Sequence, residues 1–80
     1  MNINTNAVDD AVLALLHLTL HDRNRAWKSF DWDALNRLYE RGFIHDPVSN
    51  AKSIAFTEEG LGESERLFKQ LFTIAAEPNK

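Results

Sequence analysis

Residues 7–20 constrain the fold more than any other part of the chain, because their pattern predicts a helix that is apolar over most of its circumference. At about 100° per residue, one broad side of this helix collects Val8, Ala11, Val12, Leu15, Leu16 and Leu18, with Leu13 and Leu20 at its edges. Asp10, His17 and His21 form the only clear polar stripe. A helix with so wide an apolar arc is usually central in its domain or shared with a second subunit.

The chain is short for covering such a helix. Its 80 residues form a single domain, residues 1–80, in which we expect residues 1–5 to be a loose arm. A domain of this size buries little more than about 60% of the surface of its unfolded chain, and small domains often gain stability from a partner surface. The absence of cysteine excludes disulfides, thiolate metal sites and a cysteine nucleophile. We therefore expect a homodimer.

Charge and hydropathy limit the other partners. A net charge of −3 without a basic tail gives no electrostatic reason to expect a nucleic acid or an anionic membrane. The longest uninterrupted apolar run, residues 11–16, is far shorter than the roughly 18 residues of a membrane helix. The first residues also lack the basic and apolar regions of a secretory signal. The expected location is the cytoplasm.

Capping residues predict three helices, over about 7–20, over about 32–41 and from 58 onward. Asn6, Asp31 and Thr57 are the expected N-caps, and Gly42 supplies the left-handed residue that ends the second helix. The acidic residues that follow the caps lie where the helix dipole favours negative charge: Asp9, Asp10, Asp33, Glu58 and Glu59.

Apolar spacing predicts which side of each later helix faces the core. In the second helix, the inner residues are Leu35, Leu38 and Tyr39, and the outer ones are Asn36, Arg37, Glu40 and Arg41. In the last helix, the apolar band is Leu61, Leu67, Phe68, Leu71, Phe72 and Ala75. Glu65 and Lys69 form a favourably ordered i, i+4 surface pair.

Between the second and last helices, the pattern predicts a β-hairpin. Its strands are residues 43–46 and 52–56, joined by a loop over 47–51. Ile54 and Phe56 share one face of the second strand, whereas residues 22–30 read as a connection. The predicted fold class is α+β, in the order helix, helix, strand, strand, helix, with a two-stranded antiparallel hairpin.

Two motifs resemble bacterial winged-helix regulators. They are Leu35-x-x-Leu38-x-x-Arg41-Gly-Phe-Ile44 and Ile54-x-Phe56-Thr57-Glu-Glu-Gly60, within the C-terminal two thirds of the chain. The resemblance implies a recognition helix, a two-stranded wing and a threonine-capped final helix. It also implies a function in DNA binding, as a transcriptional regulator that acts as a dimer.

The chain departs from that pattern in two ways. Residues 21–30 are barely enough for a connection, so the helix that normally supports the recognition helix is missing. Asp31 and Asp33 lie at the end of the recognition helix that should approach bases and phosphates, where carboxylates repel DNA. These departures favour a winged-helix-like domain that has lost DNA reading.

Nearly the whole chain is also similar to a group of short uncharacterised bacterial proteins. The segments that carry this resemblance are Ala11-Val-Leu-Ala-Leu-Leu16, Leu18-Thr-Leu-His-Asp22, Arg25-Ala-Trp-Lys28 and Phe30-Asp-Trp-Asp33. It implies a bacterial origin and no known activity.

His17 and His21 have the i, i+4 spacing by which a helix presents two imidazoles to zinc. The glutamate of the metalloprotease motif is absent, and a third ligand would have to be His45 or Asp22. The alternative is a polar stripe that faces solvent or a partner. We favour this alternative and predict no metal and no cofactor.

Trp27 and Trp32 lie five residues apart around a chain reversal and can both anchor the core. Exposure of either would instead indicate a binding surface, because tryptophan is enriched at interface hot spots. The candidate partner-binding residues are Trp27, Trp32, Leu13 and Leu20. For the alternative DNA-binding regulator, the candidate residues are Arg23, Arg25, Lys28, Arg37 and Arg41.

Catalytic motifs are not recognisable in the sequence. The serines lack a nucleophile elbow or triad setting, and Gly60-x-Gly62 is too short to be a phosphate loop. We read these glycines as permitting close packing. The sequence therefore predicts a protein-interaction or dimerisation module that is not an enzyme.

Overall fold

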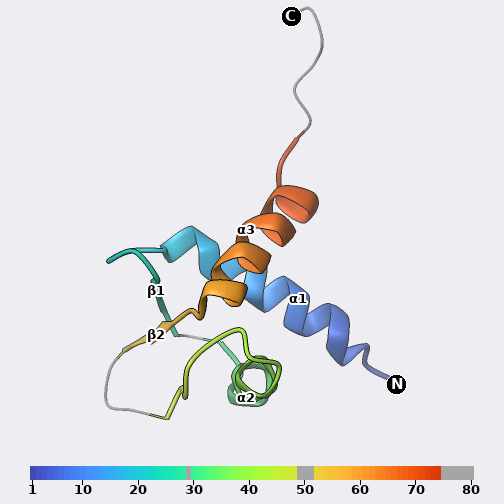
Figure 1. Ribbon diagram of the computed structural model, residues 1–80. Coiled ribbons are helices and arrows are strands. Elements are labelled where there is room, and N and C mark those ends of the chain that lie inside the picture. The colour runs from blue at the N-terminus through green and yellow to red at the C-terminus, as the bar shows by residue number, and fades with distance from the viewer. Residues whose placement is uncertain (29, 49–51, 75–80) are drawn as a thin grey trace, which may run out of the picture.

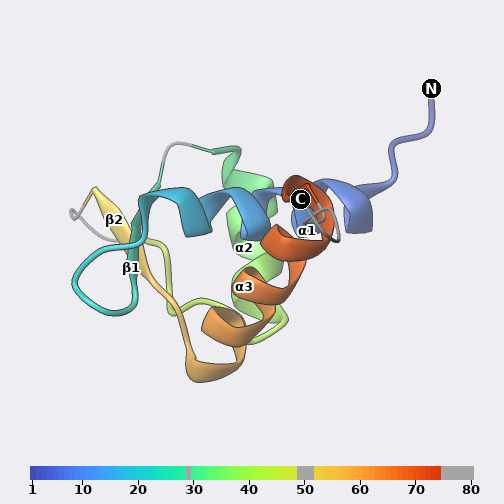
Figure 2. The ribbon, with the colours of Figure 1, turned by 90° about the horizontal axis from the view of Figure 1, so that it is seen from above.

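A computed structural model describes residues 1–28, 30–48 and 52–74, in which the helices pack against one another and a small antiparallel sheet lies at one end (Figure 1). The elements are α1 (Thr5–Leu16), the 3-10 turn η1 (His17–Thr19), β1 (Arg25–Trp27), α2 (Trp32–Glu40), β2 (Ser53–Ala55) and α3 (Glu58–Phe72). Viewed from above, α1 and α3 cross, with α2 beneath them and the sheet at one end (Figure 2). The predicted α+β class is confirmed.

Three of the predicted helix ends are confirmed. The Asp31 side chain accepts a hydrogen bond from the Ala34 amide at 3.2 Å, and Thr57 Oγ1 accepts one from the Gly60 amide at 3.0 Å. Gly42 ends α2 with a φ of +83°. These side chains satisfy amides that have no partner inside the helix.

The ends of α1 differ from the prediction. Its N-cap is Asn4, whose Oδ1 accepts a hydrogen bond from the Ala7 amide at 3.0 Å, so Asn6 lies inside the helix. Asn4 and Asn6 are equally good caps in isolation, and the sequence signal does not choose between them. The α-helix ends at Leu16, and the chain then tightens into η1.

β1 lies in the segment that reads as a connection in the sequence. It pairs antiparallel with β2, with Arg25 opposite Ala55, Ala26 opposite Ile54 and Trp27 opposite Ser53. The three residues of β1 place only one side chain, that of Ala26, in the core. So short a segment shows too little alternation of apolar and polar residues to predict a strand. The tertiary pairing with β2 therefore decides this element.

The two strands predicted for the hairpin pair over a shorter length, and residues 49–51 of its predicted loop lie outside the described residues. Ile44 forms an isolated antiparallel bridge with Phe56, and the His45 amide donates to the Ala55 carbonyl at 2.9 Å. The five predicted elements thus follow one another in the expected order, with β1 added between the first two helices. β2 lies between β1 and residues 43–45.

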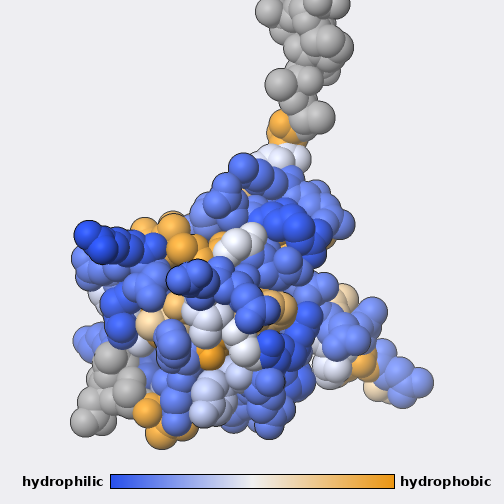
Figure 3. Space-filling view, viewed as in Figure 1, coloured by the Kyte–Doolittle hydropathy of each residue, from blue (hydrophilic) through white to orange (hydrophobic). Residues whose placement is uncertain are grey.

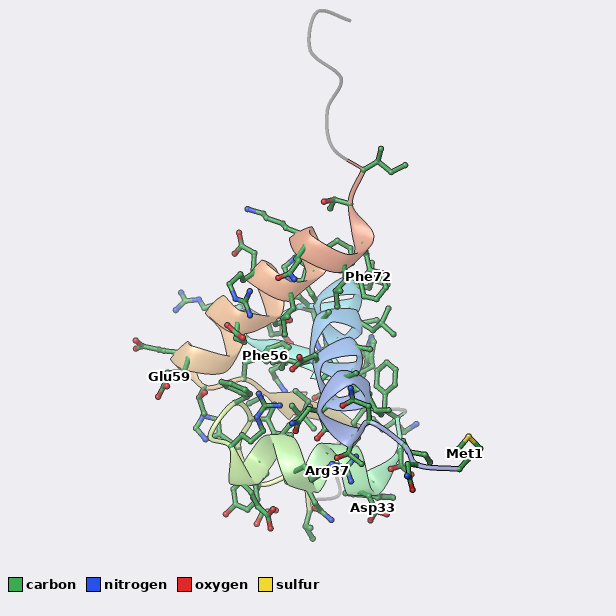
Figure 4. All side chains as sticks on the ribbon, turned by 90° about the vertical axis from the view of Figure 1, so that its right-hand side faces the viewer. Met1, Asp33, Arg37, Phe56, Glu59 and Phe72 are labelled. Carbon is green, nitrogen blue, oxygen red and sulfur yellow. The ribbon has the colours of Figure 1, made fainter. Side chains whose placement is uncertain are left out.

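The core lies where the three helices meet the sheet, with Phe56 at the centre of Figure 4. Its buried apolar residues are Val12, Leu13, Ala14, Leu16, Ala26, Ala34, Leu35, Leu38, Ile44, Ile54, Phe56 and Leu67. Ile54 and Phe56 share the buried face of β2, as predicted. Tyr39 was predicted to face inward, but it is 45% exposed, and Ala34 takes its place in the core.

An ion pair between the buried Asp9 and the partly exposed Arg37 joins α1 to α2. Arg37 Nε and Nη2 donate to the two carboxylate oxygens of Asp9 at 2.7 and 2.8 Å, and Asp9 is only 1% exposed. Asp9 therefore does not act as a solvent-facing complement to the helix dipole, and Arg37 does not point away from the domain. Apolar periodicity missed this pair because it treats charged residues as outward-facing.

α3 packs across α1. Ser64 Oγ is buried and donates to the Leu13 carbonyl at 2.8 Å. The predicted surface pair is confirmed, with Lys69 Nζ 2.9 Å from Glu65 Oε2. In the predicted apolar band of α3, Leu67 is buried but Leu71 and Phe72 are 47% and 45% exposed, and Ala75 lies outside the described residues. Among the described helices, none has the length and apolar character needed to cross a membrane.

Candidate interaction surface

Trp27 lies half exposed on β1, on the side opposite the buried Ala26. Its indole stacks on the His21 ring at a centroid distance of 4.4 Å. Its amide donates to Thr19 Oγ1 at 3.1 Å, and His21 Nδ1 is 2.8 Å from the Thr19 carbonyl. Because a carbonyl only accepts, Nδ1 donates in this bond. The indole is therefore held in place at the surface.

Trp32 lies at the start of α2 and is also 51% exposed. Lys28 Nζ is 5.4 Å from its ring centroid, within the range of a cation–π contact. The same ammonium donates to the Pro47 carbonyl at 2.7 Å. Neither tryptophan is a core anchor, which is the observation that makes them candidates for partner binding.

The two leucines predicted to join this surface lie elsewhere. Leu13 is fully buried where α1 packs against α3, and it is not available to a partner. Leu20 is half-buried and packs against the core. Both leucines belong to the core. A helical projection alone does not distinguish apolar residues of the core from apolar residues of an interface.

α1 has a second, outward apolar side that the prediction merges with the core side. Four residues form this surface, here called the α1 stripe: Val8, Ala11, Leu15 and Leu18. Val8 is 38% and Leu18 64% exposed, and Ala11 and Leu15 are half-buried. Phe72 lies beside the C-terminal half of α1 (Figure 4). By contrast, the face that carries α3 in Figure 3 is mainly hydrophilic, with small separate hydrophobic areas.

The two histidines of the first helix have different surroundings. The His17 ring is 5.1 Å from the Phe68 ring, and its Nδ1 is buried with no hydrogen-bond partner in the described part of the chain. His21 stacks on Trp27 and lies beyond η1, so the regular i, i+4 geometry is lost. The described residues contain no group of three or more His, Cys, Asp or Glu side chains placed to bind a metal ion.

The candidate DNA-binding cations are mostly engaged within the domain. Arg37 is bound to Asp9, and Arg25 donates to Ser53 Oγ at 2.8 Å and to the Ser53 carbonyl at 3.1 Å. Arg41 is 3.5 Å from Asp10 and 4.8 Å from the Phe43 ring centroid. Arg23 is exposed in the turn before β1, where its φ is +74° and that of Asp22 is +47°.

Ion pairs also shift the pKa values of several charged groups. The hydrogen bonds that Arg37 donates to the Asp9 carboxylate raise the pKa of the Arg37 guanidinium. On α3, the hydrogen bond from Arg66 lowers the pKa of Glu63, and the bond from Lys69 lowers the pKa of Glu65. These shifts follow from structural ion pairs, one between α1 and α2 and two on the surface of α3, and do not indicate an acid–base site.

A shallow pocket lies where the turn before β1 meets the start of α3. Its volume is about 290 Å³, and it is lined by Asn24, His45, Phe56, Thr57, Glu58 and Leu61. Asn24 Nδ2 donates to the Phe56 carbonyl at 3.1 Å and so serves the sheet. The pocket is lined by one imidazole, one carboxylate and the Thr57 hydroxyl, and that hydroxyl donates to the Gly42 carbonyl and accepts from the Gly60 amide.

Comparison with known proteins places the chain in a family. The family described as Domain of unknown function (DUF6429) matches residues 4–74. The chain belongs to this family. It is also 58% identical over 73 residues to the "Uncharacterized protein y4hR" of Sinorhizobium fredii (strain NBRC 101917 / NGR234), an alignment that covers 91% of this chain and 99% of that protein. No solved structure matches the chain.

The DUF6429 match bears on the resemblance to short uncharacterised bacterial proteins. The similarity to short uncharacterised bacterial proteins is confirmed by the family and by the Sinorhizobium relative. The matched region contains all the described helices and strands, and so both tryptophans and the α1 stripe lie within the family's domain.

Proposed function

We propose that this small bacterial protein is a protein-interaction module without catalytic activity, and that it acts as a homodimer in the cytoplasm. The observation that carries the proposal is the set of large apolar side chains that remain exposed although the core is complete. Five of them, each between 45% and 64% exposed, are Leu18, Trp27, Trp32, Leu71 and Phe72. Large apolar side chains that stay exposed beside a complete core are candidate contacts for a protein partner.

The two tryptophans support a role in binding a protein partner. Both rings are held by neighbouring side chains, Trp27 by His21 and Trp32 by Lys28. A ring that is already fixed loses little conformational entropy when a partner covers it. We infer that these rings are contact residues of the module.

The order of elements supports a winged-helix-like description. α1, β1, α2, residues 43–45, β2 and α3 follow one another as they do in a winged helix from which one helix has been removed. Asp31 and Asp33 remain at the N-terminus of α2, where a DNA reader needs neutral or basic residues. We propose that the domain keeps this scaffold and does not read DNA.

Oligomeric state and DNA affinity test the proposal. Sedimentation equilibrium should show a monomer–dimer equilibrium at micromolar concentration, and a shift assay with random duplex should show no binding at physiological salt. A strictly monomeric protein would contradict the dimer. Salt-dependent DNA binding that Arg23→Ala weakens would instead favour a DNA-binding regulator. Asn36→Ala, on the exposed side of α2, is the matched control.

A further inference from the structure

The α1 stripe has a spacing that is the same when read in either direction. Its residues stand at positions 8, 11, 15 and 18, with intervals of three, four and three. η1 completes one turn in about three residues, and so Leu18 stays on the side of Leu15 although the α-helix has ended. This is the spacing by which one helix packs along another.

The sizes of the four side chains are complementary about the centre of the stripe. If two copies of α1 run antiparallel about a twofold axis near residue 13, Val8 faces Leu18 of the second copy and Ala11 faces Leu15. Each contact then joins a smaller side chain to a larger one, as close packing requires. A parallel pair would place Leu15 against Leu15 and Ala11 against Ala11, which gives one crowded and one empty layer.

We propose that the α1 stripe binds the α1 stripe of a second copy in this antiparallel arrangement. The inference rests on the proposed homodimer and specifies its interface. A twofold contact requires one surface to be complementary to itself, and the stripe meets that condition. The antiparallel arrangement also places the N-terminal end of each helix dipole beside the C-terminal end of the other, which is the favourable orientation.

The size of the stripe predicts the strength of the dimer. α1 and η1 together are about 24 Å long, and a helix is about 10 Å wide. A strip of this size provides less than the roughly 800 Å² per partner of a standard interface. Phe72 at the end of α3 is 45% exposed and lies beside the C-terminal half of α1, where it adds apolar surface. We expect a weak dimer, with a dissociation constant on the order of micromolar.

Disulfide trapping tests the arrangement, because the chain has no cysteine of its own. Equal amounts of Ala11→Cys and Leu15→Cys protein are mixed and oxidised, and the products are weighed by intact mass spectrometry. The antiparallel pair predicts that the mixed 11–15 disulfide forms several-fold faster than either symmetric disulfide. Ala11→Cys mixed with Asn36→Cys is the control for random collision, because Asn36 lies exposed on α2.

Substitutions that exchange the two sizes provide a second test. Leu15→Ala leaves a gap between two alanines and should weaken the dimer about tenfold. Ala11→Leu with Leu15→Ala restores one large and one small side chain in each layer, and should return the affinity to within about threefold of the wild type. Thermal unfolding confirms that each variant is folded.

The outcomes separate this inference from the proposed function. A dimer in sedimentation that gives mainly 11–11 and 15–15 disulfides, or no excess of 11–15 over the control, overturns the antiparallel arrangement and leaves the homodimer standing. A strictly monomeric wild type overturns both. A mixed disulfide in excess, together with rescue by the double variant, supports the antiparallel pair.

Discussion

At the scale of single residues, Asp9 carries the largest electrostatic constraint in the domain. Its carboxylate is 1% exposed and receives both hydrogen bonds from Arg37. A buried charge without its partner is strongly unfavourable, whereas a satisfied pair contributes little net stability compared with apolar packing. The pair therefore fixes the position of α2 against α1 more than it adds to the total stability.

Removing the carboxylate should destabilise the fold. We expect Asp9→Ala to lower the free energy of unfolding by about 2 kcal/mol, because it leaves a gap at a buried position and removes the partner of Arg37, whose side chain is 34% exposed and is partly hydrated. Urea denaturation measures this change. Asp10→Ala is the matched control, since Asp10 is 39% exposed and 3.5 Å from Arg41, and it should cost less than about 1 kcal/mol. Equal losses for the two variants would contradict a special role for Asp9.

At the scale of the elements, the start of α3 is fixed by a contact that only glycine permits. A Cβ atom on Gly60 would lie 1.6 Å from the carbonyl oxygen of Phe43, whereas one on Gly62 would meet nothing within 4 Å. The sequence predicts that both glycines permit close packing, but only Gly60 does so. The difference depends on residues 43–45 lying against β2, which no local pattern around position 60 reveals.

Alanine substitutions at these two positions should have opposite effects. Gly60→Ala forces the backbone of α3 away from Phe43, and we expect it to lower the free energy of unfolding by more than about 2 kcal/mol. Gly62→Ala should raise it by about 0.5–1 kcal/mol, because alanine is the better helix former at an open site. Thermal and urea unfolding of the two variants measure both changes. A harmless Gly60→Ala would show that α3 does not lie against Phe43.

The ion pairs on α3 predict a pH dependence. Glu63 and Glu65 have lowered pKa values in the folded chain, from an ordinary value of 4.5, owing to Arg66 and Lys69. Their contribution to stability is therefore present above pH 4.5 and is lost as the pH falls through the lowered pKa values. Urea midpoints between pH 7 and pH 3 should fall less steeply for the Glu63→Gln, Glu65→Gln variant. The effect is small, because both pairs are exposed.

The elements that the sequence predicts well are those with local signals. Asp31 and Thr57 bind amides three residues ahead, and the left-handed Gly42 ends α2. β1 was missed because its pairing partner lies far along the chain, at β2. The candidate surface was also predicted only in part. The sequence identifies Trp27 and Trp32 as candidates, but their exposure depends on packing against distant parts of the chain. Leu13 was misplaced because periodicity finds apolar sides without showing which of them the rest of the chain covers.

At the scale of the whole molecule, part of the apolar content forms a complete core and part stays exposed outside it. Twelve apolar residues are buried in the core of the described chain, and the α1 stripe, Leu71 and Phe72 remain outside it. A domain this small has a narrow margin of stability. Covering the stripe with a second copy adds stability that depends on protein concentration.

The melting temperature should therefore rise with protein concentration. When the folded protein is dimeric, each tenfold rise in concentration stabilises the folded chain by about 0.7 kcal/mol per subunit, half of the 1.4 kcal/mol that a factor of ten represents for the dimer. For a domain of this size, that corresponds to a rise in Tm of roughly 3–6 °C. Calorimetry from low micromolar to millimolar concentration measures this rise in Tm.

Leu18→Ser should flatten the dependence of Tm on concentration, because it places a hydroxyl in the α1–α1 contact. Val48→Ser removes an equally exposed apolar side chain outside the stripe and should leave the slope unchanged. A wild-type Tm that is constant over this range would contradict the homodimer.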